Sequence, residues 1–175
     1  IGPNTASTWN LNFSYQGTIG AITFVNFRKV VGGSGNDTFI VQATGNVSDC
    51  DGGDGTDSLV VSTGFGAQLV LTGPGSGTYN TNTTFTGIEN LTGGTGNDIL
   101  RVHSEGWLPG TFDGGDSSSN EINFSSNSGV PVSVDVTQSS VTEVANFTNV
   151  VRFVGNTHAE STFRGPDFSS SWELT

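Results

Sequence analysis

Residues 32–40 read GGSGNDTFI, residues 52–60 read GGDGTDSLV and residues 93–101 read GGTGNDILR. All three stretches fit one nonapeptide pattern, G-G-x-G-x-D-x-U-x, in which a glycine-rich turn with an aspartate is followed by an apolar strand residue U. Three matches at related spacings are hard to obtain by chance. The chain is therefore expected to be an array of repeated structural units.

Turns of this kind recur at a nearly constant distance. Successive turns begin near residues 32, 52, 73, 93, 114, 135 and 155, and one step backwards leads to residue 12. This spacing predicts about eight coils of 20 or 21 residues each. Residues 1–175 then form a single segment, with no separate domain or linker.

A slower repeat runs through the first one. Residues 24–30 read FVNFRKV, residues 85–91 read FTGIENL and residues 147–153 read FTNVVRF, with the same three apolar places at offsets of 61 and 62. The repeating module is therefore expected to be three coils long, about 61 residues.

Apolar residues keep their places within the coils. The clearest series is Val30, Cys50, Leu71, Leu91, Phe112, Val134, Phe153 and Leu174. Together with two further apolar series, it predicts an all-β chain folded as a parallel β-solenoid (β-helix) with a triangular interior, whose coils stack ~4.8 Å apart. A Greek-key sandwich would explain short strands, but neither the constant coil nor the three-coil module.

Composition limits the partners of the chain. The 16 acidic and 5 basic residues give a formal net charge of -11, which argues against nucleic acid or anionic lipid and favours cations. No apolar stretch approaches the ~18 residues that a membrane span needs. The single Cys50 cannot form an internal disulfide, and its place in an apolar series predicts a buried thiol without a redox role.

The corners of the coils carry the candidate site. Glycine at the first, second and fourth places of each motif allows a positive φ, so that backbone carbonyls can turn inward. Asp37 and Asp57 lie one coil apart, and stacking would bring them within ~5 Å, where like charges repel unless a cation or a proton intervenes. Calcium accepts six to eight oxygen ligands in loose geometry and is the expected cation. The candidate metal ligands are Asp37, Asp57, Asp54, Asp98, Asp116, Gly33, Gly35, Gly53, Gly55, Gly94 and Gly96.

A simpler interpretation stays open for these turns. Gly-Asn-Asp makes good turns by itself, and the aspartate can accept backbone hydrogen bonds as in any Asx corner. The turn at residues 114–119 reads GGDSSS, which leaves Asp116 as the expected donor beside Asp98. The last turn, residues 155–160, has lost three features of the motif and is expected to be empty.

The stretch FTGIENLTGGTGND at residues 85–98 resembles the repeats-in-toxin, or hemolysin-type calcium-binding, family. The resemblance implies an exported bacterial protein whose turns bind calcium through aspartates and backbone carbonyls. Family repeats usually follow one another in nine-residue tandem, whereas the full motifs here are a whole coil apart. That spacing is more similar to the β-helical shafts of large exoproteins and filamentous adhesins.

An enzyme is not expected. Only His103 and His158 are present, far apart in the sequence, and the five basic residues are scattered, so acid, base and neutralising groups do not converge. Trp9, Trp107 and Trp172 could form a platform for sugars, although Trp107 is expected to fill a corner beside Leu108.

The sequence thus predicts a non-enzymatic, calcium-stabilised structural or adhesive segment of a secreted bacterial surface protein or extracellular fibre. Its open strand edges would either continue into neighbouring sequence or stack end to end. The alternative is a calcium-dependent carbohydrate-binding or polysaccharide-active β-helix module, with a cell-surface glycan as partner.

Overall fold

The computed structural model describes residues 1–127 and 129–165, and this part of the chain is all-β. It contains no helix, and so none long and apolar enough to cross a membrane. The strands are β1 (Thr8–Phe13), β2 (Gln16–Ile19), β3 (Ile22–Val25), β4 (Lys29–Gly33), β5 (Thr38–Gln42), β6 (Asp49–Gly53), β7 (Ser58–Ser62), β8 (Gln68–Gly73), β9 (Ser76–Tyr79), β10 (Thr83–Thr86), β11 (Asn90–Thr92), β12 (Ile99–Val102), β13 (Leu108–Asp113), β14 (Glu121–Asn123), β15 (Ser133–Asp135), β16 (Ser140–Val141), β17 (Val144–Thr148), β18 (Arg152–Val154) and β19 (Thr162–Arg164).

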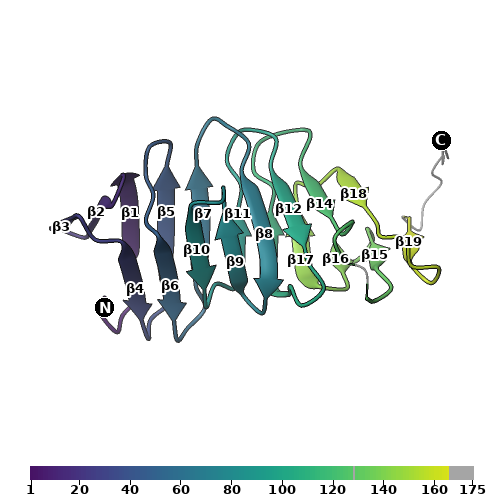
Figure 1. Ribbon diagram of the computed structural model, residues 1–175, viewed down its shortest axis with the longest axis horizontal. Coiled ribbons are helices and arrows are strands. Elements are labelled where there is room, and N and C mark those ends of the chain that lie inside the picture. The colour runs from purple at the N-terminus through teal and green to yellow at the C-terminus, as the bar shows by residue number, and fades with distance from the viewer. Residues whose placement is uncertain (128, 166–175) are drawn as a thin grey trace.

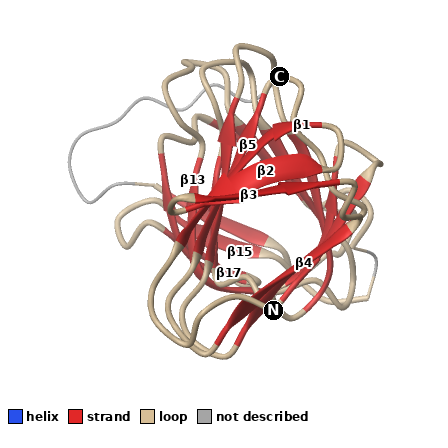
Figure 2. Ribbon diagram, turned by 90° about the vertical axis from the view of Figure 1, so that its left-hand side faces the viewer, coloured by secondary structure: helices blue, strands red, loops and turns tan. Residues whose placement is uncertain are grey.

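Two sheets enclose the interior. Sheet 1 has eleven strands in the order β19-β15-β16-β17-β13-β11-β7-β5-β1-β2-β3, and sheet 2 has eight in the order β18-β14-β12-β8-β9-β10-β6-β4. The strands advance along the long axis from the N-terminal to the C-terminal end (Figure 1), and the view along that axis shows them around one common interior (Figure 2). The described residues therefore form two sheets and not three, and the prediction of a triangular interior from three apolar series is wrong.

Parallel neighbours lie one coil apart. Lys29 of β4 pairs with Asp49 of β6, and Thr38 of β5 pairs with Ser58 of β7, each a single coil further along the chain. The offset is larger between β7 and β11, where Ser58 pairs with Asn90, because an extra pair of strands lies within that coil. The regular step from coil to coil thus holds between these insertions and not across them.

Each insertion adds two strands to a regular one and so forms a three-stranded antiparallel meander: β1–β2–β3, β8–β9–β10 and β15–β16–β17. From β1 to β7 the chain visits sheets 1, 2, 1, 2 and 1, with the first meander lying wholly in sheet 1. The chain alternates between the sheets, and five visits separate the start of one meander from the start of the next. The second meander therefore lies in sheet 2 and the third lies again in sheet 1. Residues that are equivalent in the slower repeat therefore lie on opposite sides of the molecule in successive modules.

Rows of apolar side chains, aligned by the parallel register, form the core. The longest buried row crosses sheet 1 and consists of Trp9, Phe39, Leu59, Leu91, Phe112 and Phe147. The rings of Trp9 and Phe39 stack with centroids 5.6 Å apart. Cys50 is buried in a row of sheet 2, between Val30 and Phe85, as expected.

The apolar series found in the sequence does not form one row. Val30, Cys50, Leu71 and Phe153 belong to sheet 2, Leu91, Phe112 and Val134 belong to sheet 1, and Leu174 lies outside the described residues. The series is split because each meander moves the following coils to the other sheet.

Removal of one side chain from the long buried row tests this core. Leu59→Ala should lower the free energy of unfolding by about 2–5 kcal/mol, because the cavity would lie between Phe39 and Leu91. Val151→Ala, at a position 64% exposed, should change it by less than about 0.5 kcal/mol. Urea unfolding measures both, and equal effects of the two substitutions would contradict the described packing.

Candidate functional site

Three aspartates of the nonapeptide motifs are buried. Asp37, Asp57 and Asp98 are 1%, 0% and 0% exposed, and each ends a turn immediately before β5, β7 or β12. A buried carboxyl group has to find partners for its oxygens, since removal from water is costly. The partners of these oxygens therefore decide what the corners can bind.

In Asp57 and Glu89, one side-chain oxygen accepts a backbone N–H of the preceding coil. Asp57 Oδ1 accepts the N–H of Asp37 at 2.6 Å, and Glu89 Oε2 accepts the N–H of Asp57 at 2.7 Å. We call Asp37, Asp57 and Glu89 the first column. It follows the edge where the chain passes from sheet 2 to sheet 1.

The opposite edge carries a second column of the same kind, formed by Ala67, Asp98 and Asn120. Asp98 Oδ1 accepts the N–H of Ala67 at 2.5 Å, and Asn120 Oδ1 accepts the N–H of Asp98 at 2.9 Å. Backbone hydrogen bonding by corner side chains, the simpler interpretation of the motifs, therefore accounts for one oxygen of Asp57 and one of Asp98.

The remaining oxygens are buried without a partner. Asp37 Oδ1 and Oδ2, Asp57 Oδ2 and Asp98 Oδ2 make no hydrogen bond of ordinary geometry. Native structures leave few such groups, and each calls for an explanation such as an ion.

At each aspartate corner, the unpartnered Oδ2 and a backbone carbonyl oxygen of the next coil approach the same glycine. A Cβ on Gly32 would lie 2.4 Å from Asp37 Oδ2 and 2.2 Å from the oxygen of Gly52. The corresponding distances at Gly52 are 2.5 Å to Asp57 Oδ2 and 2.0 Å to the oxygen of Gly87. Two hydrogen-bond acceptors thus approach the same point at each corner, and only glycine leaves room for them.

The third aspartate corner repeats this arrangement. A Cβ on Gly93 would lie 2.4 Å from Asp98 Oδ2 and 2.8 Å from the oxygen of Gly114. Without a proton or a cation between them, the two oxygens at each of the three corners repel each other.

The fourth corner has the same geometry, but its carbonyl oxygens accept hydrogen bonds from a side chain. Asn120 Nδ2 donates to the carbonyl oxygens of Ser117 at 3.0 Å and Asn149 at 2.9 Å, beside Gly114. An amide therefore places a donor where the three aspartates place an acceptor. The comparison indicates that the aspartate corners require a positive group that the asparagine corner does not.

Burial and neighbouring charges alter the acidity of these groups. Burial raises the pKa of Asp57 above its ordinary value of 3.8; the hydrogen bond from the Asp37 N–H opposes this shift, and the charge of Glu89 adds to it. Burial also raises the pKa of Asp98, against the opposing effects of the Ala67 and Gly94 N–H groups. Protons and cations therefore compete for the same oxygens.

The other candidate acids lie elsewhere. Asp54 and Asp116 are exposed, and their backbone N–H groups bond to the oxygens of Gly33 and Gly94 in the preceding coil, at 2.9 and 3.1 Å. The structure does not bring the Asp116 side chain to Asp98; Asn120 lies there instead, because the turn before it is one residue longer.

Six glycines were predicted to turn backbone carbonyls inward, toward a bound metal. Gly33, Gly53 and Gly55 have a positive φ, as expected, whereas Gly35, Gly94 and Gly96 do not. The latter three are needed for close approach: a Cβ on Gly94 would lie 2.3 Å from the oxygen of Thr63 in the preceding coil. The glycines therefore serve both the turn itself and the stacking of turns.

Sequence reasoning missed Glu89 and Asn120. Each lies two residues before a buried row residue, Leu91 or Ile122, as Asp37 lies before Phe39. That spacing, rather than the glycine motif, was the available signal. Among residues 1–127 and 129–165, no three histidine, cysteine or acidic side chains converge as a metal-binding group, so a cation would also need carbonyl or water oxygens.

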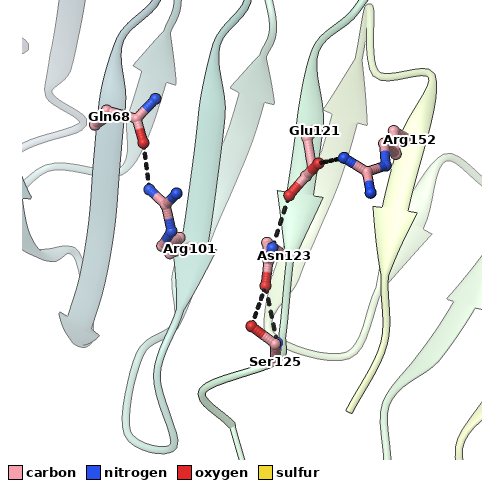
Figure 3. Close-up of polar contacts among 6 residues, drawn as sticks. All are labelled: Gln68, Arg101, Glu121, Asn123, Ser125 and Arg152. Carbon is pink, nitrogen blue, oxygen red and sulfur yellow. Dashed lines mark hydrogen bonds and ion pairs between the residues drawn. The ribbon is translucent and has the colours of Figure 1, made fainter.

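The scattered basic residues pair across coils. On sheet 2, Arg101 donates to Gln68, and Arg152 donates to Glu121 at 2.6 Å (Figure 3). Asn123 also donates to Glu121, at 2.7 Å. These basic groups connect neighbouring strands and do not gather around an acid and a base.

Comparisons of the chain with protein-family models, with curated proteins and with solved structures find no match. The chemistry of the corners therefore rests on their geometry.

The raised pKa of Asp98 predicts a specific dependence of stability on pH. In the presence of a chelator, the folded protein binds this proton more tightly than the unfolded chain does. The contribution of the carboxyl group is therefore complete below about 3.8 and is lost as the pH rises through the raised folded value. Urea unfolding of wild type and Asp98→Asn from pH 3 to 8 measures it.

The difference in stability between wild type and Asp98→Asn should fall with rising pH, whereas Glu160→Gln, at an exposed position, should follow wild type. A difference that is constant, or that grows with pH, would show that Asp98 is not held as a buried acid.

Proposed function

We propose that this chain is a calcium-stabilised, non-enzymatic segment of a parallel β-solenoid, which serves as a structural or adhesive shaft of a secreted bacterial surface protein or extracellular fibre. The observation that carries the proposal is the arrangement at the aspartate corners. There, buried carboxylate oxygens without partners adjoin carbonyl oxygens, while an asparagine at an equivalent corner supplies a donor.

The arrangement of the strands supports the solenoid. Parallel neighbours lie one coil apart, the chain alternates between two sheets, and buried rows continue from coil to coil. Each coil therefore contacts mainly its neighbours, as in repeat proteins whose length can grow without a larger core. Such a one-dimensional array suits a shaft or fibre.

Calcium fits the available ligands better than other common metals. The corners offer carboxylate and carbonyl oxygens, without histidine or cysteine, and calcium accepts six to eight oxygens in flexible geometry. The net charge of -11 also favours a cation. Because calcium would bind the folded corners and not the unfolded chain, it would stabilise the protein in a calcium-rich exterior.

The N-terminal end supports stacking with a further coil. A cavity of about 1060 Å³ lies there, lined in part by Trp9, Phe24 and Phe27. Phe27 is 59% exposed, whereas Ile88, its counterpart in the next module, is fully buried. The edge of β10 in the second module is occupied by β6, and among the described residues the equivalent edge of β3 is open. A coil of the same kind, from neighbouring sequence or from a second copy, fits this end.

A carbohydrate-binding module is a second candidate, favoured by one observation. Trp107 is 46% exposed, although the sequence placed it beside Leu108 in a corner. A half-exposed indole ring can stack on a sugar face. If the module binds glycans, Trp107→Ala should abolish binding on a glycan array while Phe65→Ala, at another exposed aromatic position, should not. An array without any signal for wild type would remove this candidate.

Calcium titration of chelator-treated protein tests the main proposal. Calcium at ~100 times its Kd should raise the melting temperature by roughly 5–10 °C, as expected for one site on a chain of this size. The double substitution Asp37→Asn and Asp57→Asn should reduce this rise, because each amide replaces an anionic ligand by a donor to the facing carbonyl. Circular dichroism measures the melting.

Asp49→Asn, at an exposed position of β6, serves as the control and should respond to calcium like wild type. An unchanged melting temperature, together with no bound metal by elemental analysis, would show that the turns are corners only.

A further inference from the structure

The first column contains an acid that no repeat motif provides. Glu89 comes from the short loop between β10 and β11, where the nonapeptide is absent. Its Oε2 atom accepts the N–H of Asp57 at 2.7 Å, as Asp57 accepts the N–H of Asp37. Glu89 therefore continues the column of corner carboxylates past the last motif on this edge.

The step from Asp57 to Glu89 involves oxygens of three residues. Asp57 is completely buried and its Oδ2 atom is without a partner. The carbonyl oxygen of Gly87, two residues before Glu89, approaches the same point above Gly52. The hydrogen bond from the Asp57 N–H to Oε2, 2.7 Å long, holds the Glu89 carboxylate beside Asp57. Asp57 Oδ2 and the Gly87 carbonyl thus approach one point, and a second carboxylate is bonded to the backbone of the same aspartate.

The second column differs in charge. Asp98 has Ala67 on one side, without a polar side chain, and the neutral Asn120 on the other. The amide of Asn120 is saturated by the carbonyls of Ser117 and Asn149. In the described part of the chain, the second column therefore offers no other anionic ligand beside Asp98.

We propose that a divalent cation binds at the step between Asp57 and Glu89, with Glu89 as the carboxylate that completes the first column, and that the second edge lacks such a site because Asn120 replaces the second acid. This inference rests on the proposed calcium binding and assigns it to one edge of the molecule. The number of anionic ligands sets the affinity of oxygen sites for calcium, so the two edges should differ strongly.

Glu89→Gln is the direct test, with calcium alone as the probe in isothermal titration calorimetry of the whole chain. Glutamine keeps the shape and an oxygen that can accept the Asp57 N–H, so the variant should fold, which circular dichroism checks. The affinity of the tightest site should fall at least about tenfold. Glu105→Gln, in the exposed loop that follows on the same edge, should bind like wild type.

Asn120→Asp tests the second edge by gain of function. The variant loses both amide donors and should melt at a lower temperature in chelator, but it places a second acid beside Asp98 and should bind one additional calcium ion. Elemental analysis and calorimetry give the stoichiometry.

The outcomes separate this inference from the proposed function. Wild-type binding with an unchanged Glu89→Gln variant would overturn the role of Glu89 and leave calcium binding intact. Asn120→Asp without an additional ion would overturn the assignment of the two edges. Absence of calcium binding by wild type would overturn both the inference and the proposed function.

Discussion

In-register pairing of parallel strands places a side chain against its counterpart in the next strand of the sheet, and this constraint governs the rest of the structure. Apolar counterparts such as Phe39 and Leu59 gain from it by burying each other. Polar counterparts need complementary chemistry, which Asn36 provides by accepting the N–H of Thr56. A diagonal neighbour can supply it too, as Asp51 does for Lys29 at 3.1 Å. At the aspartate corners, the same stacking brings a carboxylate oxygen and a backbone carbonyl oxygen, both hydrogen-bond acceptors, to the same glycine.

The route of the chain between the sheets determines where these corners lie. Each module visits the sheets an odd number of times, so Asp37 and Asp98, equivalent in sequence, lie on opposite edges. The motif repeats therefore do not accumulate into one continuous row of sites. On the first edge the row is extended by Glu89, and on the second it is ended by Asn120. The exchange of an acid for an amide thus gives the two edges different numbers of buried carboxylates that a cation could neutralise.

Much of the fold could be predicted from sequence because its signals are local. The nonapeptide turns, the alternation around Phe39 and Leu59, and the burial of Cys50 follow from spacing alone. The two-sheet arrangement could not be predicted, because a meander such as β8–β9–β10 resembles one more coil in sequence while it changes the sheet of all later strands. For the same reason the series from Val30 to Phe153 reads as one ladder but divides between two sheets.

The candidate site was predictable only in part. The buried places of Asp37 and Asp57 follow from the motif, but Glu89 and Asn120 take their places through backbone register, which no motif encodes. If the oxygens at the aspartate corners hold a cation, an anomalous difference map from crystals grown with calcium is the most direct measurement of it. We expect a peak bonded to Asp57 Oδ2 and the carbonyl oxygen of Gly87. A map without a peak there, with Asp57 Oδ2 hydrogen-bonded to a donor, would show that the corners hold no cation.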